Sequence, residues 1–167
     1  MSSLVTRGLT RAFGTFVAVD QVDFALEPGA RHALIGPNGA GKTTFVNLLS
    51  GALAATGGTV ALFGEDITTL PQHARVKRGL ARTFQVNQLF PDFTPEEALT
   101  FAAAEHLGLG PTWLRPISRM AVPKDEAARL LDRLHFPEAD RRRPTRELPY
   151  GRQRLLEIAL ALAMHPR

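Results

Sequence analysis

Residues 36–44 read Gly36-Pro37-Asn38-Gly39-Ala40-Gly41-Lys42-Thr43-Thr44, which fits the pattern G-x-x-x-x-G-K-[ST]. In this pattern, glycines let the backbone turn tightly and point successive N–H groups at phosphate oxygens, at the positive end of a helix dipole. The lysine reaches the β- and γ-phosphates, and the hydroxyl that follows it ligates Mg²⁺. We call this stretch the phosphate loop, and it predicts a nucleotide site in which Lys42 and Thr43 contact phosphate and metal.

The residues on either side of the phosphate loop favour the same interpretation. Arg31–Ile35 is a short, largely apolar run, which predicts a buried strand leading into the loop. After the loop, apolar residues recur at helical spacing from Phe45 to Leu49, and Gly51 suits the end of a helix. An ordinary glycine-rich turn is the alternative, but it explains neither of these flanking patterns.

Composition limits the class of protein. The 167 residues are 44% hydrophobic and 22% charged, as in a folded globular domain. The absence of cysteine excludes a disulfide framework, a thiolate metal site and a thiol nucleophile. No apolar run approaches the ~20 residues that cross a bilayer, and Met1-Ser2-Ser3 does not begin a signal peptide.

The net charge of +4 and the calculated pI near 10.3 raise the question of nucleic-acid binding. The one basic cluster, Arg141-Arg142-Arg143, lies between Pro137 and Pro144, which favours a solvated loop. One tyrosine and one tryptophan are too few for an aromatic surface that stacks bases. We therefore expect no nucleic-acid partner, and the scattered histidines predict no metal besides the Mg²⁺ of the nucleotide.

The remaining pattern predicts strands first and helices later. Turn residues separate the segments, with Phe13-Gly14-Thr15 between the first two strands. The expected strands are 4–9, 17–26 and 60–63; the expected helices are 70–81, 96–107, 124–134 and 152–164, with a strand end at 82–85 and an irregular connection at 108–123. The last helix is apolar on most of its circumference, which predicts burial.

Two further stretches join the phosphate loop in a resemblance to one family. They are Arg82-Thr83-Phe84-Gln85 and Leu148-Pro149-Tyr150-Gly151-Arg152-Gln153-Arg154, the latter followed by Leu156-Glu157-Ile158-Ala159. In this order and separation, the three stretches resemble the ATP-binding subunits of ATP-binding cassette (ABC) transporters, along the whole chain. Thr83-Phe84-Gln85 before Leu89-Phe90, with Tyr-Gly in the later stretch, is most similar to subunits of branched-chain amino acid importers.

The resemblance implies an α/β fold. This fold is a P-loop NTPase core of the ABC type with an antiparallel β subdomain and an inserted α-helical subdomain, C-terminally incomplete. Residues 1–167 would form a single ABC-type ATP-binding domain. Within it, 1–85 would be the core and β subdomain, 86–147 the helical subdomain, and 148–167 the signature motif and its helix.

By the same resemblance, Phe13 would stack on the adenine ring, although a strand-end core aromatic is the alternative. Gln85 would reach Mg²⁺ and the attacking water. The cofactors would be ATP and Mg²⁺, with the metal on Thr43 and Gln85. The expected nucleotide-binding residues are Phe13, Gly36, Asn38, Gly39, Ala40, Gly41, Lys42, Thr43, Thr44 and Gln85.

The signature stretch would face the γ-phosphate held by a second ATP-binding subunit, identical or related, in a head-to-tail pair. Its residues are Leu148, Pro149, Tyr150, Gly151, Arg152 and Gln153. The sequence departs from the usual Leu-Ser-Gly-Gly-Gln of the family. Pro149 replaces the serine and Tyr150 the first glycine, while Arg152 stands at the glutamine position and offers a positive charge.

In the family, two carboxylates at the end of an apolar strand and a histidine beyond it serve hydrolysis. This chain reaches Arg167 before either, so no catalytic residue is assigned, and we expect a truncated domain that does not hydrolyse ATP alone. Glu65-Asp66 follows a glycine and precedes Gln85, and we interpret it as a solvated turn.

The leading hypothesis is an ATPase motor subunit of an importer for branched-chain or other hydrophobic amino acids. It would be a peripheral protein on the cytoplasmic face of the cell membrane, bound to permease subunits through a groove near Leu89, Phe90 and Phe93. The first alternative is a nucleotide-binding module without catalysis. The second is a soluble ABC-type protein that acts on nucleic acid.

Overall fold

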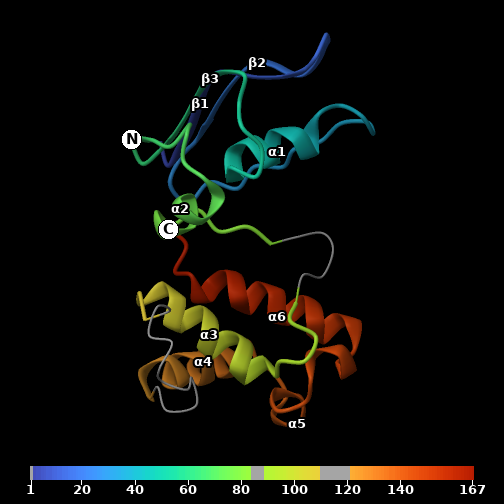
Figure 1. The fold of residues 1–167 in the computed structure, drawn as a ribbon, viewed down its shortest axis with the longest axis vertical. Coiled ribbons are helices and arrows are strands. Elements are labelled where there is room, and N and C mark those ends of the chain that lie inside the picture. The colour runs from blue at the N-terminus through green and yellow to red at the C-terminus, as the bar shows by residue number, and fades with distance from the viewer. Residues whose placement is uncertain (1, 84–88, 110–120) are drawn as a thin grey trace. The chain divides into compact units, whose positions relative to one another are not determined.

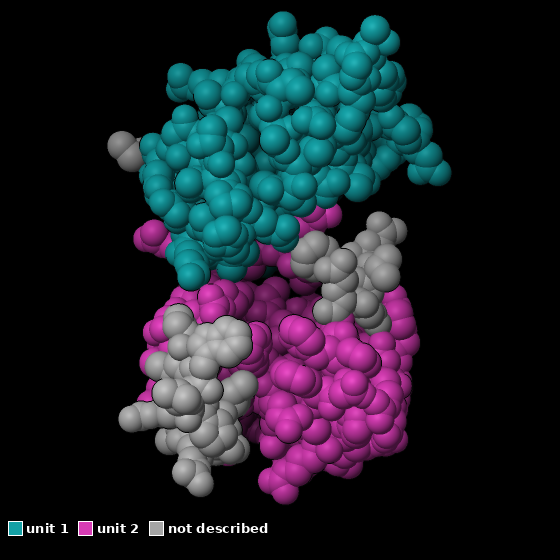
Figure 2. Space-filling model, in the orientation of Figure 1, with its two compact units in different colours: residues 1–78 teal, residues 79–167 magenta. Residues whose placement is uncertain are grey.

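The computed structural model describes residues 2–83, 89–109 and 121–167. The chain divides into two compact units, residues 1–78 and residues 79–167, which Figure 2 colours separately as unit 1 and unit 2. Figure 1 shows the strands and the first two helices in unit 1, and the later helices in unit 2. Each unit is described below by itself.

Unit 1 contains a four-stranded antiparallel sheet in the order β2-β1-β3-β4. Its strands are β1 (Leu4–Phe13), β2 (Phe16–Leu26), β3 (Gly57–Leu62) and β4 (Glu65–Asp66). A turn at residues 14–15 joins β1 to β2, as the sequence predicts. On the buried face, Leu4 and Leu9 of β1 lie in the core with Val60 of β3.

Helix α1 (Lys42–Ser50) follows the phosphate loop and packs on β2 (Figure 1). Phe45 of α1 contacts Phe24 of β2 edge to face, with ring centroids 5.9 Å apart. The helix ends at Gly51, whose φ of 76° lies in the left-handed region that favours glycine. The predicted helix and its glycine end are therefore confirmed.

The strand predicted at residues 31–35 is wrong for this structure. These residues have no strand hydrogen bonding and are exposed, Leu34 by 52% and Ile35 by 88%. Within the described ranges, no strand pairs with them, because the sheet of unit 1 consists of β1 to β4. An apolar run becomes a buried strand only beside a partner, and the run itself does not say which segment that partner is.

The C-terminal end of α1 is held by Arg75, which lies on the short helix α2 (Gln72–Lys77) and is 2% exposed. Its guanidinium donates to the carbonyls of Leu48, Leu49, Thr68 and Leu70, at 2.7, 2.8, 2.8 and 2.9 Å. Burial lowers the pKa of Arg75, whereas the charge of Asp66 opposes this shift. Arginine starts so high that it stays protonated, so a buried cation stabilises the negative end of the helix.

Unit 2 is helical. It contains α3 (Pro95–His106), α4 (Ala121–Arg133), α5 (Glu138–Arg141), the 3₁₀ helix η2 (Thr145–Glu147) and α6 (Tyr150–Ala163) (Figure 1). The start of α3 is a capping box formed by Thr94 and Glu97. The amide of Glu97 donates to Thr94 Oγ1 at 3.2 Å, and the amide of Thr94 donates to Glu97 Oε2 at 2.9 Å. None of the helices in the described ranges is long and apolar enough to span a membrane.

The core of unit 2 lies where α3, α4 and α6 meet. Its buried members include Leu99, Leu131, Phe136, Leu148, Leu156 and Ala159. The predicted burial of the last helix is confirmed for one face of α6, where Leu156, Ala159 and Ala163 are buried, whereas Ile158 is 46% exposed. At 100° per residue, Ile158 points away from the face that carries Leu156, so one face of α6 enters the core.

The prediction of a solvated loop for the basic cluster Arg141–Arg143 is confirmed for Arg142 and Arg143, whose side chains are 80% and 51% exposed, and is wrong for Arg141. Arg141 closes α5, its side chain is only 12% exposed, and its Nε and Nη2 each donate to the carbonyl of Phe136 at 3.1 Å. Each arginine also has an acidic neighbour, and the three carboxylates come from α4, α3 and α5. The ion pairs are Arg141–Asp132 (2.7 Å), Arg142–Glu96 (3.7 Å) and Arg143–Asp140 (3.6 Å).

Candidate nucleotide-binding site

The phosphate loop ends at an uncapped helix N-terminus. Gly41 is the N-cap of α1, with φ 77° and ψ 3°, and no side chain caps the helix there. Within α1, the amide of Phe45 donates to the carbonyl of Gly41 at 2.8 Å. The amides of the first turn have no acceptor inside the helix, so they and the positive dipole end are available to an anion.

Gly41 is required by a close approach to β2. A Cβ atom built on it would lie 2.3 Å from the carbonyl oxygen of Ala18, a distance that no side chain tolerates. The positive φ adds to this constraint, because residues with a side chain rarely adopt it. The glycine that the sequence motif demands therefore also seats the phosphate loop against the sheet.

Lys42 is held over the phosphate loop. Its Nζ donates to the carbonyls of Gly36 at 2.7 Å and Pro37 at 2.6 Å, and Ala40 N closes the turn on the Pro37 carbonyl at 3.3 Å. Thr43 is exposed in the first turn of α1. An ammonium group, open amides and an exposed hydroxyl at one helix end fit a Mg²⁺-bound triphosphate. Thr43 would hold the metal, and Lys42 would neutralise phosphate charge.

Phe13 is the last residue of β1 and is 47% exposed, so the alternative that it is a core aromatic is wrong. The guanidinium of Arg11 lies over the ring, with Cζ 4.5 Å from the ring centroid. Sequence reasoning did not single out Arg11. The spacing offered a signal for this contact, because a long cationic residue two positions before a strand-end aromatic lies on the same face of the strand.

Gln85 lies outside the described residues, as does Phe84. Arg82 and Thr83 are described and have no strand hydrogen bonding, so the predicted strand end is wrong at these two positions. A strand end needs a neighbouring strand, and the described sheet includes none of these residues. The role of Gln85 remains a prediction.

The signature stretch opens α6, in agreement with the predicted helix start. Pro149 is the N-cap without a side-chain hydrogen bond, and Tyr150, at the first helical position, is 67% exposed. Gly151 is exposed, and a Cβ on it would meet nothing within 4 Å. The Nε of Arg152 lies 3.6 Å from Asp140 Oδ2, so this arginine shares its charge with a carboxylate of the same unit.

Gln153 braces the segment that precedes α6, a role that its place in the signature stretch did not predict. Its Nε2 donates to the carbonyls of Thr145 at 3.2 Å and Leu148 at 3.0 Å. Thr145 in turn donates from N and Oγ1 to the carbonyl of Phe93, at 2.9 and 2.7 Å. Hydrogen bonds therefore connect the start of α6 with the residues just before α3. An isolated glutamine in the first turns of a helix carries no sequence signal for such a role.

Glu65 and Asp66 are exposed, as the sequence predicts, but they form the short strand β4, paired with β3, and not a turn. The Oε1 of Glu65 pairs with Nε of Arg78 at 2.5 Å. The Oγ1 and N of Thr68 donate to Asp66 Oδ1 at 2.6 and 2.8 Å. These hydrogen bonds keep the pKa of Asp66 below its ordinary value, so this carboxylate is ionised and engaged within its own turn.

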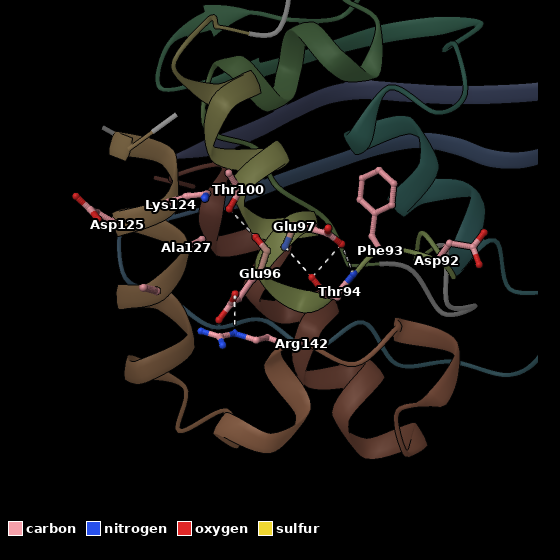
Figure 3. A pocket seen from close by; sticks show the side chains of 11 residues that line it. Asp92, Phe93, Thr94, Glu96, Glu97, Thr100, Lys124, Asp125, Ala127 and Arg142 are labelled. Atoms are coloured by element: carbon pink, nitrogen blue, oxygen red, sulfur yellow. Dashed lines mark hydrogen bonds and ion pairs between the residues drawn. The ribbon is translucent and has the colours of Figure 1, made fainter. Parts of the chain in front are cut away.

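A groove of about 820 Å³ lies in unit 2 between α3 and α4 (Figure 3). Its walls include Phe93, Thr94, Glu96, Thr100, Lys124, Ala127 and Arg142. The carboxylate of Glu97 caps α3 and that of Glu96 faces Arg142, as the dashed lines in Figure 3 show. Glu96, Glu97 and Arg142 thus make structural contacts at the groove. Phe93 and Arg142 are among the lining residues that the sequence had singled out.

Three phenylalanines form an aromatic cluster at the start of α3. The ring centroid of Phe90 lies 5.1 Å from that of Phe93 and 6.1 Å from that of Phe101. Phe90 is 49% exposed and Phe101 40%. The sequence had singled out Phe90 and Phe93 but not Phe101 of α3.

A glycine-rich loop that opens an uncapped helix, in a chain of antiparallel strands and helices, is typical of P-loop nucleotide-binding domains. The structure falls in this α/β class, and the comparisons with known proteins narrow it. Residues 19–167 match the family model described as ABC transporter. The chain therefore belongs to the ABC transporter family, in its ATP-binding part.

Similar proteins include the high-affinity branched-chain amino acid transport ATP-binding protein BraF of Pseudomonas aeruginosa, which is 39% identical over 170 residues. LivG of Escherichia coli K12, with the same description, is 37% identical over 171 residues. Each alignment covers 98% of this chain and 66% of the relative. The chain thus spans about two thirds of the length of these relatives.

Solved structures give the same result for the fold. MJ1267, described as an ATP-binding cassette of an ABC transporter, superposes with a TM-score of 0.84 at 30% identity, over 99% of this chain and 66% of that one. The structure of the ADP conformation of MJ1267 gives a TM-score of 0.84 at 31% identity, with the same coverage. The ABC-type fold expected from the sequence is therefore confirmed.

Proposed function

We propose that this chain is the ATP-binding motor part of an ABC importer for branched-chain or other hydrophobic amino acids. The observation that carries the proposal is the open N-terminus of α1, where Gly41, Lys42 and Thr43 together offer amides, an ammonium group and a hydroxyl. The descriptions of BraF and LivG support the substrate class. The site of action is the cytoplasmic face of the membrane, where such a subunit would drive a permease.

The ATP site on the phosphate loop of one subunit is completed by the start of α6 of a second subunit, in a head-to-tail pair. Exposed Tyr150 and Gly151 at an uncapped helix start support this assignment, since helix N-termini attract phosphate. Gln153 holds the segment before α6 in place, which keeps this helix start ordered. Gln85 supplies a further oxygen for Mg²⁺.

The aromatic cluster supplies the surface for the permease. Phe90 and Phe101 expose apolar rings that pack on one another at the start of α3. Exposed aromatic groups of this kind are frequent anchors in protein interfaces. Hydrogen bonds from Thr145 to the Phe93 carbonyl connect this surface with the signature stretch. Binding of the permease to the aromatic cluster would therefore affect the position of the start of α6.

The proposal is tested by the Mg²⁺ dependence of ATP binding in a Thr43→Val variant. We expect the unaltered chain to bind ATP more tightly with Mg²⁺ than with EDTA. Thr43→Val should lose about tenfold in affinity with Mg²⁺ and little without it, because one metal ligand of about 1.4 kcal/mol is removed. Isothermal titration calorimetry measures both.

Thr59→Val is the matched control, since Thr59 is exposed on β3 and the substitution is chemically the same. It should leave both affinities unchanged. An undiminished Mg²⁺ effect in Thr43→Val would remove Thr43 from the metal site. Absence of ATP binding by the unaltered chain would overturn the proposed function as a whole.

The second candidate function is nucleotide binding without hydrolysis. It is favoured by the engagement of Glu65 and Asp66 with Arg78 and Thr68, which leaves neither carboxylate to activate water. We expect residues 1–167 alone to bind Mg·ATP without measurable phosphate release in a coupled phosphate assay. Release that depends on Lys42 would show that these residues contain the hydrolytic groups.

A further inference from the structure

We propose that Arg11 is a positioning residue for the nucleobase: it covers one face of Phe13 and so presents the other face to adenine. This inference rests on the proposed ATP binding at the phosphate loop. It assigns a role to a side chain that lies outside the sequence motifs quoted above.

Arg11 and Phe13 lie two residues apart at the end of β1. The guanidinium carbon stands 4.5 Å from the centre of the Phe13 ring, within the distance at which a cation is attracted to a π face. Phe13 is nevertheless 47% exposed. Since an aromatic ring has two faces and the cation covers one, this exposure leaves the second face for stacking.

Arg11 is itself anchored from the segment that follows α1. Its Nη1 donates to the carbonyl of Ala54 at 2.8 Å. The same segment is fastened to β1 by Thr56, whose N donates to the Thr10 carbonyl at 2.9 Å and whose Oγ1 accepts from Ala12 N at 3.0 Å. The arginine therefore links Phe13 to the helix whose other end carries the phosphate loop, within unit 1.

The Nε of Arg11 is buried and has no hydrogen-bond partner in the described part of the chain. A buried donor without an acceptor is unfavourable, so hydrogen bonding alone does not explain the placement of this side chain. Stacking on the Phe13 ring is the interaction that compensates for it. The arrangement favours keeping the ring in one orientation, because ring rotation would break the stack.

Different residues determine the affinity for the base and the affinity for the phosphates. A guanidinium on one face draws π density from the ring, which favours a neutral, electron-rich base on the opposite face. The phosphates are bound by α1 and Lys42 through charge and amides. Arg11 should therefore change the affinity for the nucleobase while leaving the affinity for a phosphate chain as it is.

The experiment compares Mg·ATP with Mg·tripolyphosphate, which lacks base and sugar, on the whole chain by calorimetry. Arg11→Met keeps side-chain length but removes the cation; we expect about a fivefold loss for ATP, the size of an exposed cation–π contact, and none for tripolyphosphate. Arg11→Lys should recover part of the loss. In a Phe13→Ala background, Arg11→Met should have no further effect on ATP.

Arg7→Met, an exposed arginine on the same strand, is the control for charge and should alter neither affinity. An equal loss for ATP and tripolyphosphate in both Arg11 variants would mean that Arg11 supports the fold, and would overturn the proposal. So would an unchanged ATP affinity, or an undiminished Arg11→Met effect in the Phe13→Ala background. Failure of the unaltered chain to bind tripolyphosphate would instead refute the phosphate loop assignment beneath it.

Discussion

Replacing Lys42 with alanine should weaken Mg·ATP binding by about a hundredfold or more. The ammonium group lies over the phosphate loop, 2.6 and 2.7 Å from two carbonyls that orient it. A hydrogen bond to a charged group contributes about 1.5–3 kcal/mol, and Lys42 is placed to reach two phosphates. Equilibrium titration of the variant with Mg·ATP measures the loss.

Lys77→Ala is the matched control, because it removes the same charge from an exposed position on α2 of the same unit. It should change the affinity less than twofold, an effect of the size expected for a screened surface charge. A thermal melt should show Lys42→Ala folded, because the side chain is not part of the core. An unchanged Mg·ATP affinity in Lys42→Ala would place the phosphates elsewhere.

Replacing Arg75 with leucine should destabilise unit 1 by about 3 kcal/mol, because carbonyls buried around the guanidinium lose their donor. Four carbonyls depend on it, two of them at the end of α1 and two in the segment before α2. A loss of this size should speed amide hydrogen exchange in α1 and β1 about a hundredfold. Mass spectrometry of peptides from residues 4–13 and 42–50 measures it.

Arg78→Leu serves as the control for Arg75→Leu. The Arg78 side chain is 37% exposed and pairs with Glu65, whose side chain is 54% exposed. Exposed ion pairs contribute less than about 1 kcal/mol, so exchange in α1 should hardly change. Arg75→Lys should fall between the two, because an ammonium group cannot reach four carbonyls in a planar fork. Equal exchange in Arg75→Leu and Arg78→Leu would contradict the structural role of Arg75.

Local signals explain what the sequence predicted well. The spacing of glycines and Lys42 in residues 36–44, and Gly51 after the apolar run, belong to one helix and its two ends. Likewise, Thr94 and Glu97 lie three residues apart, and their reciprocal hydrogen bonds need no distant partner. The hairpin of β1 and β2 follows from the turn at residues 14–15. In each case the residues that determine the local structure are close to one another in the sequence.

The rest depends on partners far along the sequence. Residues 31–35 look like a buried strand, but their burial requires a neighbour that the run does not encode. The role of Arg75 depends on the carbonyls of Leu48 and Leu49, which lie 27 and 26 residues earlier in the chain and accept hydrogen bonds from its guanidinium. Gln153 equally takes its meaning from Thr145. Long-range hydrogen bonds to backbone carbonyls leave no pattern in composition or spacing.

Phe13 is an intermediate case, because the resemblance placed it at the adenine and a strand-end core aromatic was the alternative. Its 47% exposure decides against the core. The contact with Arg11 then depends on the side-chain conformation and on the Ala54 carbonyl, neither of which the spacing of β1 could reveal.

The division into two units has a spectroscopic consequence. The chain has one tryptophan, Trp113, and one tyrosine, Tyr150, and both belong to residues 79–167. Unit 1, which carries the phosphate loop, therefore contributes almost nothing to absorbance or fluorescence excited at 280 nm. Any change in intrinsic emission when nucleotide is added to the phosphate loop originates in unit 2. The chain thus carries its own optical reporter, with exposed Tyr150 at the first position of the signature helix.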